Sequence, residues 1–228
     1  MANKLSIVLV HGLWADGSCW NDIIPALQAD GHEVVAVQNP LTSLADDVAA
    51  TTRALARVAG PTLLVGHSWG GFVISEAGNH AQVAGLVYVA ALAPDAGETV
   101  VDLLGRTAPT PLGQYFEQEQ GHIWLSEEGV RQAFAADVPA AVAARLYATQ
   151  TAPSAAVLGE QLSHPAWKSK PSWFVVARHD QAVHPDLQRL EAERMGATTV
   201  EVDTSHVPMI SRPDEVLRVI RAAAAQVG

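Results

Sequence analysis

Ser68 lies in the segment "GHSWGG" (66–71), between an apolar run that predicts a strand and a pattern that predicts a helix. A serine on such a corner acts as a nucleophile when its backbone is strained and the residues two positions away are small. Gly66 and Gly70 meet that requirement. The helix that follows would also direct free N–H groups toward the reaction centre. The segment therefore predicts a nucleophilic serine, against the alternative of a turn with only a structural role.

The segment "VLVHGLWADGSCW" (8–20) follows the first apolar run with a glycine-containing loop. Acyl transfer at a serine generates a negatively charged oxygen, which two backbone N–H groups can hold. We expect these donors to be Leu13, in this loop, and Trp69, directly after the serine. His11 is expected to brace the loop through hydrogen bonds, with a role as catalytic base as the less favoured alternative.

His206, in "TSHVPMISRP" (204–213), is the expected general base for Ser68. It is the last of nine histidines and lies in a loop after the last predicted strand. His67 adjoins the serine, but the local geometry directs its side chain elsewhere.

Asp180, in "VVARHDQAVHP" (175–185), is the favoured acid, because it follows a predicted strand and can orient the imidazole. Asp95 and Asp203 remain open as alternatives. His179 and His184 lie near Asp180, but this loop lacks the dense carboxylate and imidazole cluster of a zinc site. We therefore expect no metal.

Four apolar runs read as strands buried on both faces, because they are continuous rather than alternating: residues 5–10, 33–37, 61–66 and 85–92. Two more strands are expected late in the chain, at residues 172–177 and 198–203. Helical patterns lie between them, including one capped by Ser43 and one begun by Pro185 and ended by Gly196. This alternation predicts an α/β fold with a doubly wound, mostly parallel sheet of about six strands.

Residues 94–167, called the cap segment below, break the alternation. Helix-like pieces are separated there by "APTPLG" (108–113) and "TAPSAA" (151–156), with no predicted strand. We expect a helical cap inserted between strands of one sheet. The core would then be 1–93 with 168–228, and core and cap would form a single folding unit.

Composition limits the function classes. A net charge of −10 and scattered basic residues disfavour nucleic acid and anionic membranes as partners. The single cysteine, Cys19, excludes an internal disulfide framework and fits a cytoplasmic location. Assembly as a homodimer stays open.

The motifs "HGLWADGSCW", "GHSWGG", "YVAALAPDAGE", the Asp180 loop and "SHVPMISRPDEV" together resemble the α/β-hydrolase superfamily. Within it they are most similar to the small esterases related to plant methylesterases and hydroxynitrile lyases. The resemblance implies a cofactor-free hydrolase with a Ser68–His206–Asp180 triad and an acyl-enzyme on the serine. These motifs span nearly the whole chain outside the cap segment.

Two departures from the lyases favour ester hydrolysis: Val207 occupies the position of their lysine, and Gly12 occupies that of a threonine. A hydroxynitrile-lyase-like activity, an aminopeptidase-like activity and a non-catalytic small-ligand receptor remain alternatives. The aminopeptidase alternative depends on cap carboxylates that would bind a substrate ammonium. The candidates are Glu117, Glu119, Glu127 and Glu128.

An apolar substrate pocket is expected around the serine. Its predicted lining residues are Trp14, His67, Trp124, Leu125 and Val207. No arginine pair is placed to clamp a carboxylate or a phosphate. A small, fairly hydrophobic ester or thioester is therefore the expected substrate.

Overall fold

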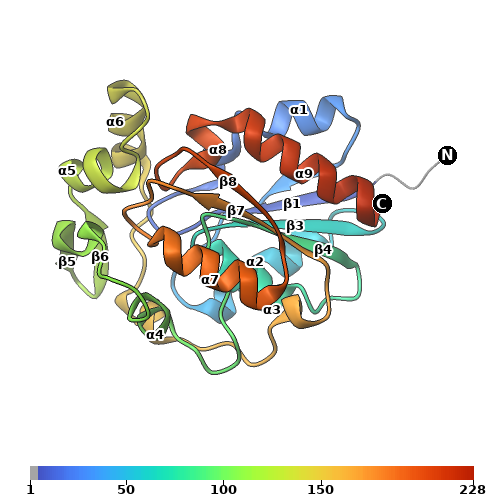
Figure 1. Cartoon of the computed structure of the whole chain (residues 1–228), viewed down its shortest axis with the longest axis horizontal. Helices are drawn as coiled ribbons and strands as arrows, with labels where there is room; N and C mark the ends of the chain where they lie inside the picture. Colours follow the sequence, from blue (N-terminus) through green and yellow to red (C-terminus); the bar gives the residue numbers. More distant parts are fainter. Residues whose placement is uncertain (1–4) are drawn as a thin grey trace.

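Six parallel strands form the central sheet in the computed structural model, which describes residues 5–228 (Figure 1). The strand order is β2-β1-β3-β4-β7-β8, and every neighbouring pair is parallel. The strands are β1 (Ser6–Val10), β2 (Val34–Ala36), β3 (Thr62–His67), β4 (Val83–Val89), β7 (Ser172–Ala177) and β8 (Thr198–Val202). The predicted doubly wound, parallel α/β fold is thereby confirmed.

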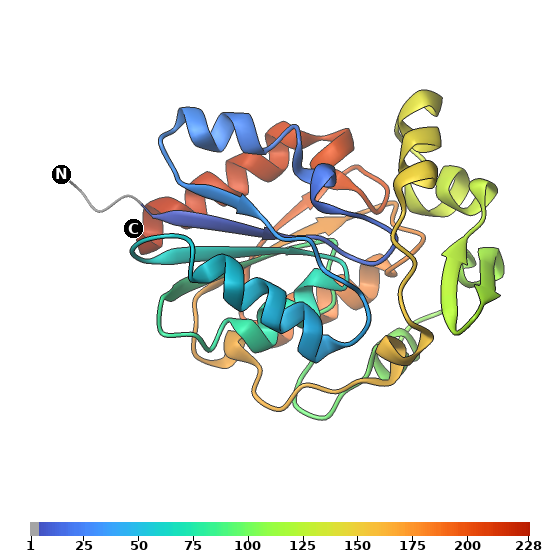
Figure 2. The same ribbon diagram turned by 180° about the vertical axis from the view of Figure 1, so that it is seen from behind.

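Helices cover both faces of this sheet (Figures 1 and 2). On one face lie α1 (Ile24–Ala29), α8 (Pro208–Ser211) and α9 (Pro213–Val227); on the other lie α2 (Leu44–Leu55), α3 (Gly70–Ala77) and α7 (Pro185–Met195). Local chemistry sets their ends. The Ser43 side chain accepts a hydrogen bond from the Asp46 N–H at the start of α2. Gly196, with φ +62°, ends the helix that Pro185 begins.

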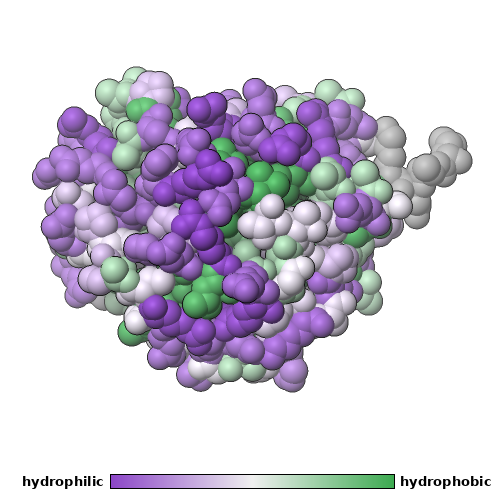
Figure 3. Space-filling model, viewed as in Figure 1, coloured by the Kyte–Doolittle hydropathy of each residue, from purple (hydrophilic) through white to green (hydrophobic). Residues whose placement is uncertain are grey.

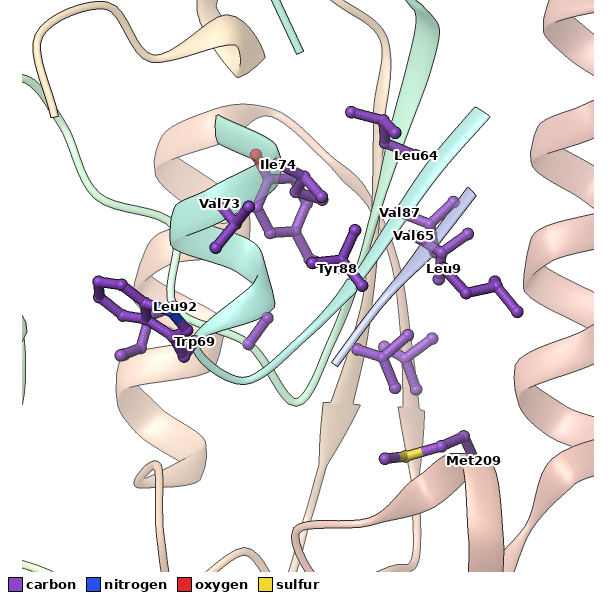
Figure 4. Packing of buried hydrophobic residues seen from close by; sticks show 14 of the residues in the cluster. Leu9, Leu64, Val65, Trp69, Val73, Ile74, Val87, Tyr88, Leu92 and Met209 are labelled. Carbon is purple, nitrogen blue, oxygen red and sulfur yellow. The ribbon is translucent and has the colours of Figure 1, made fainter. Parts of the chain in front are cut away.

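Strands β1, β3 and β7 are buried along their whole length, as expected for strands covered on both faces. Side chains from neighbouring strands, such as Leu9, Leu64 and Val87, join one hydrophobic cluster with Val73 and Ile74 of α3 (Figure 4). This packing fixes the carboxyl ends of the strands, where the candidate site lies.

Most of the cap segment lies at the carboxyl end of the sheet, and its last residues return past α3 to the start of β7 (Figures 1 and 2). It is built from short elements: α4 (Val100–Leu104), η2 (Pro111–Tyr115), β5 (Phe116–Glu119), β6 (His122–Leu125), α5 (Glu127–Gly129), the π-helical turn η3 (Val130–Phe134), α6 (Ala140–Thr149), η4 (Ala155–Gly159) and η5 (Ala166–Lys168). One further short helix, η1 (Gly17–Trp20), follows β1 in the core.

The antiparallel hairpin of β5 and β6 differs from the expected all-helical cap. Gln120 and Gly121 connect the two strands with φ values of +50° and +79°, the backbone of a tight hairpin turn. Along β6, Ile123 and Leu125 are buried while Trp124 is exposed. This alternation over four residues is the sequence signal for the hairpin, and it is too short to stand out among the helical patterns.

The surface view in Figure 3 is mostly hydrophilic, with hydrophobic residues in small separate groups. Across the described part of the chain, no helix combines the length and apolar character needed to cross a membrane.

Candidate active site

Ser68 occupies the corner between β3 and α3 with φ +53°, a left-handed conformation that non-glycine residues rarely adopt. Its N–H donates to the Val89 carbonyl of the neighbouring strand at 3.2 Å, which holds the strained backbone in place. A Cβ at Gly66 would lie 2.5 Å from the Gly70 carbonyl oxygen, and a Cβ at Gly70 would lie 2.4 Å from the Val10 carbonyl oxygen. Both flanking positions therefore require glycine.

The loop after β1 runs directly against this corner. A Cβ on Gly12 would lie 2.6 Å from the Ser68 Cβ. Among residues 5–228, the main-chain amides of Leu13 and Trp69 donate to no carbonyl or side-chain acceptor of the protein. An oxyanion hole requires N–H groups that lie next to the serine and have no acceptor within the protein, and these two amides meet that requirement.

His11 braces the same loop. Its Nδ1–H donates to the Gly12 carbonyl oxygen at 2.8 Å, and its Nε2 accepts from the Asn39 N–H at 2.9 Å. The Asn39 side chain in turn donates to the His11 carbonyl. Burial lowers the pKa of the His11 imidazole, which keeps it neutral. With both ring nitrogens engaged, His11 has a structural role in this site.

His206 and Asp180 form a buried pair, and their residues are 1% and 4% exposed. The His206 Nδ1–H donates to Asp180 Oδ2 at 2.7 Å, because an ionised carboxylate can only accept. The same carboxylate accepts from the Ala182 and Val183 N–H groups at 2.7 and 2.9 Å and from Gln188 Nε2 at 2.8 Å. This arrangement fixes the imidazole tautomer and leaves His206 Nε2 free to accept a proton.

The two alternative acids lie elsewhere. Asp95 pairs with Lys168 at 2.5 Å, and that ion pair lowers the pKa of the Asp95 carboxyl. Asp203 is exposed and pairs with Arg178 at 3.2 Å. The structure brings Asp180 to His206 and leaves both alternatives in ion pairs with basic side chains.

His67 contacts the loop that carries His206. Its Nε2–H donates to the His206 carbonyl oxygen at 2.8 Å, and the two rings lie 4.7 Å apart. Burial lowers the pKa of His67 well below its usual value, so the ring is neutral. His67 therefore supports the backbone of His206, in addition to the pocket-lining role that the sequence predicts for it.

The other predicted pocket residues fall into two groups. Trp14, Leu125 and Val207 are buried, and the Trp14 Nε1–H donates to the Ile123 carbonyl oxygen of β6 at 2.8 Å. Trp124 lies on the outward side of β6, is 41% exposed and lines a surface hollow with Tyr147. The structure does not bring Trp124 to the other site residues.

Several site contacts were not anticipated from the sequence. Phe134 of η3 places its ring edge-on to His206, with centroids 5.2 Å apart. The buried Asp47 of α2 accepts from Trp69 Nε1 at 2.7 Å and from the Leu41 N–H at 2.9 Å. Burial raises the pKa of the Asp47 carboxyl to about 6. A charged residue on an amphipathic helix carries no sequence signal that distinguishes it from a solvated one.

Potential metal ligands do not cluster in the described part of the chain. Within residues 5–228, no group of three or more His, Cys, Asp or Glu side chains is placed to hold a metal ion. His179 is exposed beside Asp203, and His184 accepts from the Asp186 N–H at the start of α7.

A parallel sheet with a strained serine after β3 and a histidine–carboxylate pair after β8 and β7 is the arrangement of the α/β hydrolases. The family model described as "Alpha/beta hydrolase family" matches residues 7–219. The chain belongs to this family.

The chain is also similar to several characterised proteins and solved structures. The α/β hydrolase nvfD of Aspergillus novofumigatus is 26% identical over 246 residues, covering 98% of each chain. The carbendazim hydrolyzing esterase of a Nocardioides species is 30% identical over 130 residues, covering 51% of this chain and 52% of the relative. The solved structure of a pyrethroid hydrolase from Sphingobium faniae superposes with a TM-score of 0.82 at 22% identity, covering 98% of each chain, which shows a shared fold.

Proposed function

We propose that this protein is a serine carboxylesterase that cleaves small, fairly hydrophobic esters or thioesters through an acyl-enzyme on Ser68. The observation that carries the proposal is the strained Ser68 corner next to a buried His206–Asp180 pair. His67 joins the two, because it adjoins the serine in the chain and donates to the His206 carbonyl oxygen.

In the first half-reaction, His206 Nε2 takes the proton of the Ser68 hydroxyl while Oγ attacks the ester carbonyl carbon. Asp180 holds the imidazole tautomer and stabilises the imidazolium that forms. The N–H groups of Leu13 and Trp69 hold the negative oxygen of the tetrahedral intermediate. His206 then gives its proton to the departing alcohol or thiol, and the acyl group stays on the serine.

In the second half-reaction, water attacks the acyl-enzyme. His206 Nε2 removes a proton from that water, the oxyanion forms again at the Leu13 and Trp69 amides, and the acid leaves as the proton returns to Ser68 Oγ. No cofactor takes part in either half-reaction.

The substrate class follows from the walls near Ser68. Trp14, Phe134 and Val207 are apolar and buried, which suits a hydrophobic acyl or alcohol group. The names of two relatives, a carbendazim hydrolyzing esterase and a pyrethroid hydrolase, support hydrolysis of this kind. In this proposal the cap segment covers the site and the core carries the reacting groups.

The alternatives receive less support. The four glutamates that could bind a substrate ammonium, Glu117, Glu119, Glu127 and Glu128, are all exposed. Val207 supplies no ammonium group for a cyanide leaving group. A non-catalytic receptor would have the same fold and show no turnover, so a measurement of activity separates it from an esterase.

We place the enzyme in the cytoplasm, where its buried free cysteine, Cys19, stays reduced.

The test is stopped-flow and steady-state hydrolysis of p-nitrophenyl esters graded by acyl length. We expect turnover with a burst of p-nitrophenol, and its loss in Ser68→Ala. The matched control is Ser211→Ala, a serine of α8 outside the proposed triad. Wild-type protein without turnover on any ester of the panel would contradict the esterase proposal and favour a receptor.

A further inference from the structure

Ser205, the residue before His206, makes two hydrogen bonds to a single side chain of the cap segment. Its N–H donates to Asp137 Oδ2 at 2.9 Å, and its hydroxyl donates to Asp137 Oδ1. Ser205 is 2% exposed, and 68 residues separate it from Asp137 in the chain. A core loop is therefore attached to the cap segment next to the histidine.

The same stretch of the cap segment also contacts the imidazole. Asp137 follows η3, whose last residue, Phe134, lies edge-on to the His206 ring. The Ala135 N–H donates to the Val130 carbonyl at 2.8 Å, which closes this turn and sets the direction of the chain toward Asp137. One short segment thus contacts both the reacting ring and the residue before it.

The loop that carries His206 joins β8 to α8, and three side chains hold it at His206 and at the residue before it. Asp180 binds the ring Nδ1, His67 binds the carbonyl oxygen of His206, and Asp137 binds the preceding residue. The first two groups belong to the core, and the third belongs to the cap segment. Loss of the third would leave the ring bonded to Asp180 and the His206 carbonyl bonded to His67, while the backbone directly before His206 would have no contact from the cap segment.

We propose that Asp137 is a positioning residue: through Ser205 it fixes the His206 backbone, so that the cap segment sets the alignment of the imidazole with Ser68. Proton transfer requires His206 Nε2 within hydrogen-bonding reach of the serine oxygen, and a displacement of about 1 Å costs on the order of 100-fold in rate. This inference builds on the catalytic roles proposed for Ser68 and His206.

The variants follow from the hydrogen-bonding capacity of each side chain. Asp137→Ala removes both acceptors. Asp137→Asn retains a carbonyl oxygen for the Ser205 N–H, and its amide N–H can donate to the Ser205 hydroxyl. Ser205→Ala removes only the hydroxyl contact. Glu128→Ala is the matched control, because Glu128 bonds only within the cap segment, to Gln132, among the described contacts.

We expect Asp137→Ala to lower kcat for p-nitrophenyl acetate about 10-fold with KM changed less than about twofold, and Asp137→Asn to restore most of that loss. Ser205→Ala should cost about threefold in kcat, and the double variant should be no worse than Asp137→Ala, because both changes break one contact. Glu128→Ala should match the wild type. An unchanged kcat in both Asp137→Ala and Ser205→Ala, or a loss confined to KM, would overturn the inference.

A second measurement separates this inference from the esterase proposal. The proton between His206 and Asp180 should give a low-field NMR resonance, which we expect to broaden or shift in Asp137→Ala and to remain in Asp137→Asn and Glu128→Ala. If the wild type shows no turnover, this resonance still tests the positioning role. A resonance identical in Asp137→Ala and the wild type would overturn the role whatever the activity.

Discussion

The core and the cap segment contribute to the site in different ways. Ser68, Asp180 and His206 all follow core strands, on backbone held by hydrogen bonds between neighbouring strands and loops, such as the His179 N–H to the Thr204 carbonyl at 3.0 Å. The cap segment reaches the site through side-chain and single backbone contacts on short elements, including Phe134 and Asp137.

This difference predicts different responses to substitution. The core holds the proposed nucleophile, Ser68, at a position that cannot shift, because close backbone packing and the neighbouring glycines leave no alternative. The cap segment offers walls and a few hydrogen bonds, each of which can be lost separately. Changes in the core should therefore abolish activity, and changes in the cap segment should reduce it in steps.

The largest effect is expected for Asp180→Asn in the core. The amide can no longer hold the His206 tautomer that leaves Nε2 as an acceptor, so kcat should fall on the order of 10⁴-fold. Asp95→Asn, which removes the charge that pairs with Lys168 and retains a carbonyl oxygen for the Ala96 N–H, should stay within about twofold of the wild type. Similar, small losses of p-nitrophenyl acetate turnover in both variants would contradict the assignment of the acid.

A second comparison uses one glycine from each region. Gly12→Ala would place a Cβ 2.6 Å from the Ser68 Cβ and 3.0 Å from the His67 carbonyl oxygen. The loop must then move away from the serine, and we expect kcat/KM to fall about 100-fold. Gly113→Ala in the cap segment meets no atom within 4 Å and should be neutral. A fully active Gly12→Ala enzyme would show that the loop tolerates displacement.

Asp47 tests how the core supports Trp69. Asp47→Ala leaves Trp69 Nε1 and the Leu41 N–H without their acceptor, which should lower the free energy of unfolding by about 1–3 kcal/mol. Urea denaturation at pH 7 measures this loss. Arg53→Ala, at an exposed position of the same helix without a side-chain hydrogen bond or ion pair among the described contacts, is the control.

Asp47 should also make the stability of the protein decrease as pH rises. The folded state raises the pKa of the Asp47 carboxyl from 3.8 to about 6, so it favours the protonated form. The resulting stability is fully present below about pH 4 and is lost as pH rises through about 6. The stability of the wild type relative to Asp47→Asn should therefore decrease between pH 4 and 7. A difference that does not vary with pH would contradict the raised pKa.

The smallest effect is expected for Trp124→Ala in the cap segment. Its side chain is 41% exposed on the outer side of the hairpin, so kcat/KM should change less than about twofold. Trp14→Ala should cost much more, because it removes a wall of the site and the bond to the Ile123 carbonyl. A large loss in Trp124→Ala would return this residue to the substrate pocket.

The core could be predicted from the sequence because its signals are local. Strands buried on both faces appear as continuous apolar runs, and the strained corner requires Gly66 and Gly70 at fixed spacing from the serine. The end of α7 at Gly196 followed from the same kind of signal. Asp180 could be ranked above Asp95 because the pattern around it, Asp-x-x-Val-x-Pro, suits a loop that holds a carboxylate in place after a strand.

The cap segment could not be predicted in the same way, because long-range contacts determine it. The β5–β6 hairpin has four residues in each strand, and Trp14 binds its backbone from 109 residues away. Trp124 resembles a pocket residue in sequence, and only the register of the hairpin directs it outward. The bonds of Asp137 to Ser205 depend on the path of the chain after a π-helical turn, for which the sequence carries no local signal.

The central claim is that Ser68 carries the acyl group. Intact-mass analysis of the protein after treatment with a fluorophosphonate tests it most directly, with the modified peptide identified by fragmentation. We expect one adduct per chain, on Ser68, with no adduct in Ser68→Ala and much slower labelling in His206→Ala. An unlabelled wild type, or a label that persists in Ser68→Ala, would contradict the account.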